Sequence, residues 1–152
     1  MIKPKKGYTL IEVLMVLAII GILLALSAVA FLSARKTARD AKRKTDIEQI
    51  RGALETYKAD KNVYPGSQST PVQAADYVDN ALSGFLVSNY ISMLPTDPVS
   101  TLKYYYVPLI GGYALCSYLE GGNSGLSTNC QSHDCGTLNG STVVCNYEIR
   151  NP

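Results

Sequence analysis

Residues 7–32 read GYTLIEVLMVLAIIGILLALSAVAFL, and this segment decides the fold of the chain. Three lysines, Lys3, Lys5 and Lys6, precede it. Residues 13–32 then run for twenty positions without a charge. A helix needs about 20 apolar residues to cross the hydrocarbon layer of a membrane. The run is therefore long enough to span a bilayer.

Three kinds of segment share this pattern of a basic start and an apolar run. It fits a secretory signal peptide cut after Ala28-Val29-Ala30, which would release a soluble domain that begins at Phe31. It also fits a plain membrane anchor, or a leader of which only the short basic piece is removed. Glu12 bears on the choice, because placing an acid in lipid costs a few kcal/mol. A position near the interface, where its carboxylate reaches water, would explain Glu12 equally well.

The residues around Glu12 shift this balance. Residues 7–14 are Gly-Tyr-Thr-Leu-Ile-Glu-Val-Leu, and they resemble the prepilin motif of the type IV pilin and type II secretion pseudopilin family. In that motif a basic leader ends in Gly and is followed by an aromatic residue and Thr-Leu-Ile-Glu. The resemblance implies that a membrane peptidase cuts between Gly7 and Tyr8 on the cytoplasmic side. It also implies methylation of the new amino group of Tyr8.

The resemblance assigns an assembly role to Glu12. Cleavage would leave a positive amine on Tyr8, and in a filament core the amine of a neighbouring subunit could pair with the Glu12 carboxylate. An unpaired buried charge is strongly unfavourable, whereas a paired one is tolerated and sensitive to register. One feature departs from the family, in which many members carry a proline late in this helix. Here no proline lies between Pro4 and Pro65, so Gly21 and Ser27 are the candidate weak points.

The helix should continue well beyond the apolar run. Apolar side chains at Ile47, Ile50, Leu54 and Tyr57 have the spacing of one helix face and are expected to pack on a sheet. A proline and a glycine at 65–66 predict that the helix ends near Asn62. A helix over residues 8–61 would be roughly 80 Å long. We therefore divide the chain into a leader (1–7), a transmembrane or filament-core helix (8–33) and a globular head (34–152).

A basic stripe follows the apolar run. It contains six cations, with Asp40 and Asp46 among them: Arg35, Lys36, Arg39, Lys42, Arg43 and Lys44. Lys36 and Lys44 each lie four residues from Asp40, a spacing that brings side chains together on a helix. We interpret the stripe as a solvated face near lipid headgroups, able to pair with acidic neighbours. Binding of nucleic acid is not favoured, because no stacking aromatics interleave with the charges.

The head is expected to be a small antiparallel sheet laid against the helix, an α+β fold. Residues 76–92 are interpreted as a short helix, and the loops at 65–75 and 120–128 as exposed. Residues 103–107 and 113–119 form a hairpin around Gly111-Gly112, and Asn139-Gly140 is a turn that leads into a strand at 143–149. Together with a rigid bend at 94–98, this order of elements resembles the major pseudopilin of type II secretion.

All four cysteines lie in the last quarter of the chain, at Cys116, Cys130, Cys135 and Cys145. In an exported head they predict two disulfides. Pairing of nearest neighbours gives 116–130 with 135–145, and the nested alternative gives 116–145 with 130–135; we favour the first. A zinc site that uses these cysteines and His133 is the alternative, although their spacing lacks the short pairs of a zinc motif.

Some pilins bind calcium in their C-terminal loops, through Asp side chains and backbone carbonyls. Asp134 and Glu120 are present here, but no cluster of oxygen ligands stands out in the sequence. We predict no metal and no cofactor.

Charge and motifs bound the function. Residues 1–61 carry a net +6 and residues 62–152 a net −4, which together give the +2 of the whole chain. Neither a nucleophile elbow nor a phosphate loop is present in the sequence, and the chain is not predicted to be an enzyme.

The resemblance therefore implies a structural subunit of a type IV pilus or a type II secretion pseudopilus. Its partners would be copies of itself, the prepilin peptidase, a platform protein and a motor ATPase. It would span the cytoplasmic membrane once with the head outside, and then join a periplasmic or extracellular filament. A minor tip pilin that acts as an adhesin or takes up DNA is the alternative.

Overall fold

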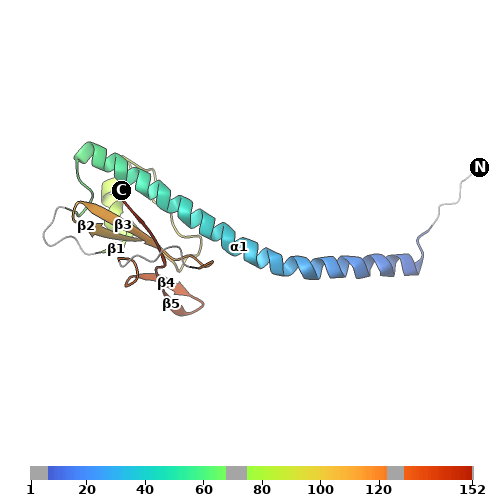
Figure 1. Cartoon of the computed structure of the whole chain (residues 1–152). Coiled ribbons are helices and arrows are strands. Elements are labelled where there is room, and N and C mark those ends of the chain that lie inside the picture. The colour runs from blue at the N-terminus through green and yellow to red at the C-terminus, as the bar shows by residue number, and fades with distance from the viewer. Residues whose placement is uncertain (1–6, 68–74, 123–128, 152) are drawn as a thin grey trace, which may run out of the picture. The chain divides into compact units, whose positions relative to one another are not determined.

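The computed structural model describes residues 7–67, 75–122 and 129–151, without the side chains of residues 28 and 29. The chain divides into two compact units, Met1–Lys36 and Thr37–Pro152. We call the second the head unit. The first element, α1 (Leu10–Lys61), contributes to both units and is the long helix that the sequence predicts. Within the head unit, α1 lies along a small antiparallel sheet (Figure 1).

Local hydrogen bonds define both the start and the end of α1. At its start the Thr9 hydroxyl accepts a hydrogen bond from the backbone N–H of Glu12, and the Glu12 carboxylate faces the N–H of Thr9 at 3.5 Å. This reciprocal arrangement is a capping box. At its end Asn62 adopts a φ of 60° and donates its N–H to the Lys58 carbonyl at 2.7 Å. Asparagine tolerates this left-handed conformation, so the predicted end near Asn62 is confirmed.

The second helix is shorter than the sequence predicts. β1 (Asp76–Tyr77) precedes α2 (Val78–Leu86). The observed helix therefore covers only part of the range 76–92 predicted from the sequence. The buried side chains Val78, Leu82 and Leu86 recur every four residues and define the helix face. Ser88 then takes a φ of 79°, which ends the helical pattern before the apolar residues at 90–91.

A four-stranded antiparallel sheet carries the head unit. Its order is β1-β2-β3-β6, with β2 (Tyr105–Leu109), β3 (Gly112–Ser117) and β6 (Tyr147–Arg150). The hairpin of β2 and β3 confirms the predicted turn at the glycines. A second, two-stranded sheet joins β4 (Asp134–Leu138) to β5 (Ser141–Val144).

The turn at Asn139-Gly140 is also confirmed, with φ values of 53° and 81° at its two central residues. Two residues with positive φ match the type of turn that Asn-Gly favours. The strand predicted over 143–149 is wrong, because the chain leaves the hairpin after Val144 and changes sheets. Asn146 marks the change: its N–H donates to the Ser117 carbonyl and its side-chain amide donates to the Leu119 carbonyl.

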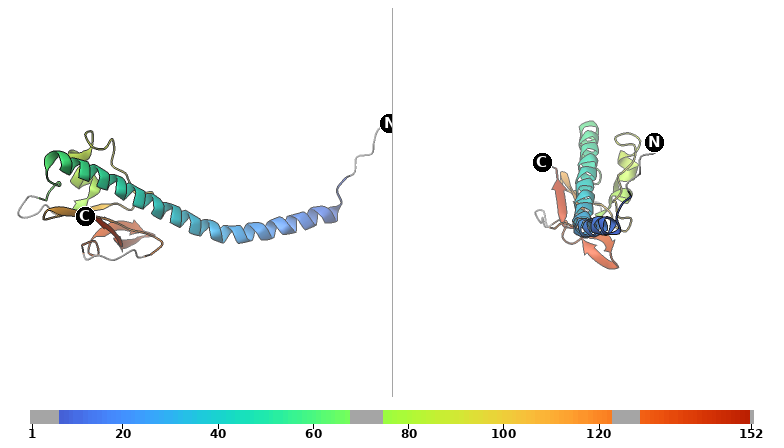
Figure 2. Two further views of the ribbon diagram at one scale, coloured as in Figure 1. Left: turned by 45° about the horizontal axis from the view of Figure 1, so that its top comes forward. Right: turned by 90° about the vertical axis from the view of Figure 1, so that its right-hand side faces the viewer.

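The two faces of the sheet have different partners. Alternate residues of β2 and β3, such as Tyr106 and Leu115, join the core formed with α1 and α2. The intervening residues Tyr105, Val107 and Cys116 face the second hairpin and the cysteines. All six residues of β3 are consequently buried. The left view of Figure 2 shows the β4–β5 hairpin on the side of the sheet away from α1.

Candidate functional site

The residues that the sequence singles out at the N-terminus lie together at the start of α1. Gly7 and Tyr8 precede the helix and are exposed, and Tyr8 has 85% of its surface accessible. Glu12 lies in the first turn, where a carboxylate interacts favourably with the helix dipole. Residues 1–6, with the three lysines of the expected leader, lie outside the described residues.

Beyond Glu12 the apolar part of α1 is exposed in the part of the chain that the structure describes. In the described structure, the segment long and apolar enough to cross a membrane contains no buried residue. Leucine, isoleucine and valine side chains are exposed all round it. Near its start, Tyr8, Glu12, Val13, Val16 and Leu17 line a shallow groove of about 290 Å³. An exposed apolar surface of this kind needs lipid or other helices to cover it.

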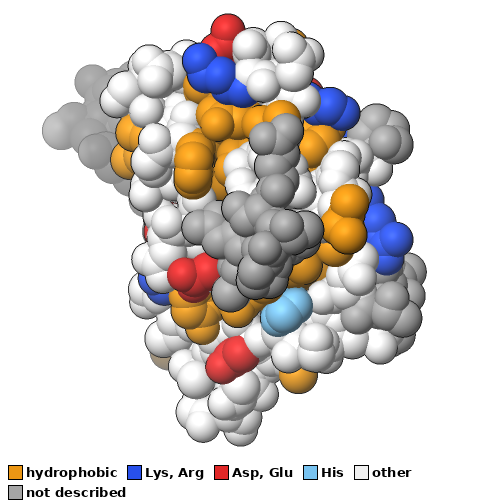
Figure 3. Space-filling view, turned by 90° about the vertical axis from the view of Figure 1, so that its left-hand side faces the viewer, with side chains coloured by type: hydrophobic (Ala, Val, Ile, Leu, Met, Phe, Trp, Pro, Cys, Tyr) orange, Lys and Arg blue, Asp and Glu red, His pale blue; other side chains and the backbone are white. Residues whose placement is uncertain are grey.

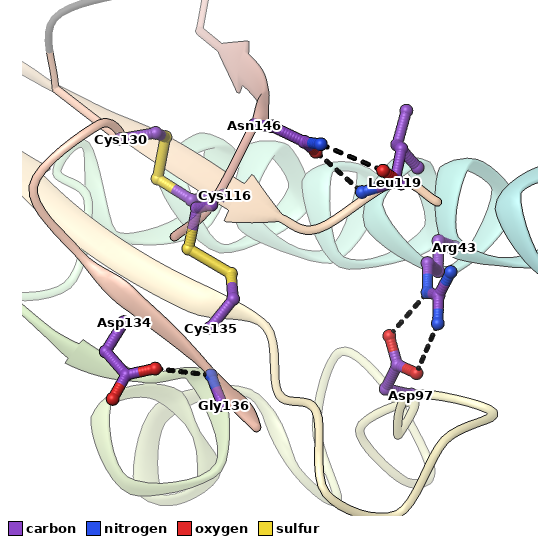
Figure 4. The surroundings of a disulfide bond; sticks show 10 residues. Arg43, Asp97, Cys116, Leu119, Cys130, Asp134, Cys135, Gly136 and Asn146 are labelled. Atoms are coloured by element: carbon purple, nitrogen blue, oxygen red, sulfur yellow. Dashed lines mark hydrogen bonds and ion pairs between the residues drawn. A yellow bond between two sulfur atoms is a disulfide. The ribbon is translucent and has the colours of Figure 1, made fainter. Parts of the chain in front are cut away.

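The head unit contains an ion-pair cluster that sequence reasoning missed. Arg43 of α1 is completely buried and donates two hydrogen bonds to Asp97, from Nε at 2.8 Å and from Nη2 at 3.1 Å (Figure 4). Its Nη1 donates to Asp40 at 2.8 Å and to Glu120 at 3.0 Å. One guanidinium therefore joins α1 to the bend at 94–98 and to the segment after β3.

Arg39 and Asp40 complete this cluster. Arg39 donates to both oxygens of Glu120, at 2.6 and 2.5 Å, and the Asp40 carboxylate accepts the backbone N–H groups of Glu120 and Gly121. Hydrogen bonds from Arg39, only partly opposed by burial, lower the pKa of Glu120 to about 2. Burial alone would lower the pKa of Arg43, but its bonds to Asp97, Glu120 and Asp40 raise it above the usual value.

These contacts correct three expectations. The basic stripe is not one solvated face, because Arg43 is buried and Arg39 is held by Glu120. Asp40 pairs with Arg43, three residues on, in place of its neighbours four residues away. The sequence predicts an exposed loop at 120–128, but the Glu120 side chain at its start is largely buried. Residues 123–128 of that loop lie outside the described residues.

Tyrosine–carboxylate pairs fasten the sheet to α1 elsewhere. Asp46 accepts the hydroxyl of Tyr104 at 2.8 Å, and Glu55 accepts the hydroxyls of Tyr64 and Tyr113, both at 2.9 Å. Burial, reinforced by these carboxylates, raises the pKa of Tyr104 and of Tyr113. Both tyrosines therefore stay protonated as donors at neutral pH.

The four cysteines form two disulfides on the face of the four-stranded sheet opposite the core formed with α1 and α2. Cys116 is bonded to Cys130 and Cys135 to Cys145, with Cα–Cα distances of 5.6 and 5.2 Å (Figure 4). This is the pairing of nearest neighbours. The first bond ties the segment after β3 back to that strand, and the second closes the β4–β5 hairpin. The sulfurs are thus bonded to one another, which removes the zinc alternative.

The described residues offer no cluster of three His, Cys, Asp or Glu side chains that could hold a metal ion. Glu120 is engaged by two arginines, and the Asp134 carboxylate accepts the N–H of Gly136 within β4. On the face of the molecule seen in Figure 3, lysines and arginines lie apart at the margins and form no single basic patch.

Comparisons with known proteins agree with the motif and extend to the head. Residues 2–28 match the family model "Prokaryotic N-terminal methylation motif" and residues 30–133 match "Type II secretion system (T2SS), protein G". The chain is 31% identical over 134 residues to type II secretion system core protein G of Pseudomonas aeruginosa, covering 84% of this chain and 92% of that one.

Two further relatives have the same name. The protein of Vibrio cholerae is 32% identical over 97 residues, covering 63% of this chain and 66% of its own length. That of Aeromonas hydrophila is 33% identical over 102 residues, covering 63% and 68%. No solved structure matches the chain significantly.

Proposed function

The chain belongs to the type II secretion system protein G family, and on that premise we propose that it is a pseudopilin that is processed at Gly7–Tyr8 and polymerises into a secretion pseudopilus. Membership of this family implies a part in a secretion-system assembly. The comparisons name a secretion protein, so they favour the pseudopilus over a pilus and do not favour a minor tip pilin. The role is structural and not enzymatic.

One observation carries the proposal: an exposed cleavage motif stands directly before an exposed apolar helix. Gly7 has open space around its Cα, so a protease can approach the backbone there. The next 20 or so residues are the unburied apolar segment. Removal of residues 1–7 by the prepilin peptidase would take away the three lysines and leave a short end before the helix, whose charge is that of the new Tyr8 amine. Methylation of the Tyr8 amine would follow, by the same enzyme.

The exposed apolar surface also supports storage in the membrane and later polymerisation. Lipid would cover it in the stored subunit, and the helices of neighbouring copies would cover it in the filament. In the filament Glu12 would be removed from water, and the amine of Tyr8 on a neighbouring copy is the partner that we propose for it. This ion pair would select the register between subunits. A platform protein and a motor ATPase are the further partners that we propose.

We propose that the head lies outside the cytoplasmic membrane. The two disulfides support this placement, because such bonds persist in oxidising compartments and are rare in the cytosol. The pseudopilus would then extend into the periplasm or the equivalent outer space. The buried Arg43 cluster would keep the sheet attached to α1 while the helix is moved out of the membrane.

Substitution of Glu12 tests the assembly step. Glutamine at this position keeps the capping hydrogen bond to Thr9 but removes the charge. We expect Glu12→Gln and Glu12→Ala to be processed, but to reduce the number of filaments by at least about tenfold, since an unpaired buried amine costs about 3–5 kcal/mol. The measurement is the amount of sheared filament relative to processed subunit in membranes.

Thr9→Ala is the matched control, because it weakens the capping box and leaves the carboxylate in place. It should assemble far better than Glu12→Gln. Normal filaments from Glu12→Gln would show that the charge of Glu12 has no part in assembly.

A further inference from the structure

A surface hollow of about 550 Å³ lies in the head unit, where the end of α1 meets α2 and the residues that follow it. Its walls include three aromatic side chains, Tyr57 of α1, Phe85 of α2 and Tyr90 beyond α2. None of them belongs to the N-terminal motif or to the Arg43 cluster. The volume falls within the range of about 300–1,000 Å³ that is typical of ligand sites.

The rings stand nearly at right angles to one another. The centroid of Tyr57 lies 6.1 Å from that of Phe85 with an interplanar angle of 88°, and 5.2 Å from that of Tyr90 with an angle of 67°. Tyr57 thus packs edge-to-face with the other two rings, and all three rings line the hollow. The face of an aromatic ring is negative and attracts cations, and cages of such rings are used to bind ammonium groups.

A carboxylate is fixed beside the rings. Asp60 accepts the hydroxyl hydrogen bond of Tyr90 at 2.6 Å. That bond, with the contribution of Lys61, lowers the pKa of Asp60 and keeps it charged. Asp60 and Lys61 also lie in the last turn of α1, where the unpaired carbonyls of a helix carry a partial negative charge. Rings, carboxylate and helix end all favour a positive ligand.

The chain's own Lys61 is the cation that pairs with this carboxylate in the structure. Its Nζ lies 3.0 Å from the Asp60 carboxylate, and both side chains are more than half exposed. A pair this exposed to solvent is held only weakly, so an incoming ammonium group can take the place of Lys61 beside Asp60. Gly84 and Asn89 on the rim are exposed, which leaves the hollow open to a side chain from outside.

We propose that this hollow is a binding site for a lysine side chain presented by another polypeptide. Its size exceeds that of one ammonium group and leaves room for the aliphatic stem against the rings. The Asp60 carboxylate would bind the ammonium group, and Tyr90 is a positioning residue that orients that carboxylate. The site goes beyond the proposed function and does not depend on processing or polymerisation.

The full chain, isotope-labelled in detergent micelles, tests the proposal with two probes. One is the peptide Gly-Lys-Gly, and the other is the same peptide with its lysine acetylated. We expect the lysine peptide to shift the NMR signals of residues 57–61 and 84–90, with a dissociation constant on the order of millimolar. Acetylation removes the charge, and the affinity should fall by about tenfold.

Matched variants separate a built site from general attraction of charge. Asp60→Asn should lose the preference for lysine, whereas Asp79→Asn should keep it. Asp79 belongs to a surface trio of the same kind, with Lys103 and Tyr77, that does not line the hollow. Lys61→Met should raise the affinity severalfold, whereas Lys58→Met, on the same helix, should leave it unchanged.

Three results would overturn the proposal. They are equal binding of the lysine and acetyl-lysine peptides, equal losses in Asp60→Asn and Asp79→Asn, and the absence of shifts at residues 57–61 and 84–90. The unfolding midpoint of each variant shows whether its head is folded. Because the assay needs neither a cut leader nor a filament, a failure of the proposed pseudopilus role would leave its outcome unaffected.

Discussion

At the scale of single residues, the charges of the head unit contribute most to its stability where they are buried. Glu120 receives three hydrogen bonds from Arg39 and Arg43, and only 8% of its side chain is exposed. Arg43 in turn contacts three carboxylates, those of Asp40, Asp97 and Glu120. Bonds of this charge-assisted kind are stronger than neutral ones. Removing one partner leaves the others buried without compensation.

The first prediction concerns the pH dependence of stability through Glu120. Its pKa is about 2 in the folded chain, against an ordinary value of 4.5, so folding favours the charged form. The resulting stability is fully present above pH 4.5 and is lost as the pH falls toward 2. Urea unfolding of the full chain in micelles, repeated between pH 7 and pH 2, measures this loss.

Glu120→Gln is expected to be less stable at pH 7 and to lack this part of the acid-induced loss. Glu48→Gln is the control, since Glu48 is 53% exposed and pairs only weakly with Arg51. Parallel curves for the wild type and Glu120→Gln would contradict a charged, stabilising Glu120.

At the scale of elements, the sequence predicts what local signals determine. The long helix, its end near Asn62, the β2–β3 hairpin and the Asn139-Gly140 turn all follow from apolar runs and turn residues within a few positions of each other. The start of α2 after β1, which pairs with β2, and the change of sheet at 145–146 depend on contacts with distant residues. Such tertiary contacts override local propensity.

The burial of Arg43 can be predicted from its position in the sequence. Arg43 lies four residues before Ile47 and seven before Ile50, in phase with the apolar face of α1. A charge at such a position needs a buried partner, and Asp97 within the bend at 94–98 supplies it. The bend was visible in the sequence, but the pairing required the fold.

The second prediction tests this link between elements. Arg43→Met keeps the length of the side chain but leaves Asp97 without its cation, and it should destabilise the head by about 3–5 kcal/mol. Arg43→Lys should lie in between, because an ammonium group cannot make the paired bonds of a guanidinium. Urea unfolding at pH 7 gives the three values.

Arg51→Met is the control for this series. Arg51 forms an ion pair with the exposed Glu48, so its loss should change the unfolding free energy by less than about 0.5 kcal/mol. An Arg43→Met variant as stable as Arg51→Met would mean that the cluster contributes no net stability.

At the scale of the whole molecule, two units of different character share one helix. The N-terminal unit offers an exposed apolar surface that needs lipid or other copies around it. The head unit has its own core, its ion-pair cluster and two disulfides. This division suits a subunit that is stored in a membrane and then polymerises through its helix while its head remains folded.

The mature N-terminus tests this account most directly. Intact mass and N-terminal sequencing of the protein from membranes and from sheared filaments should give a chain that begins at Tyr8 and is heavier by one methyl group. That result would establish processing at Gly7–Tyr8 with retention of the apolar helix. A chain that begins at Phe31 would mean that a signal peptide is removed after Ala30, and it would contradict the pseudopilin account.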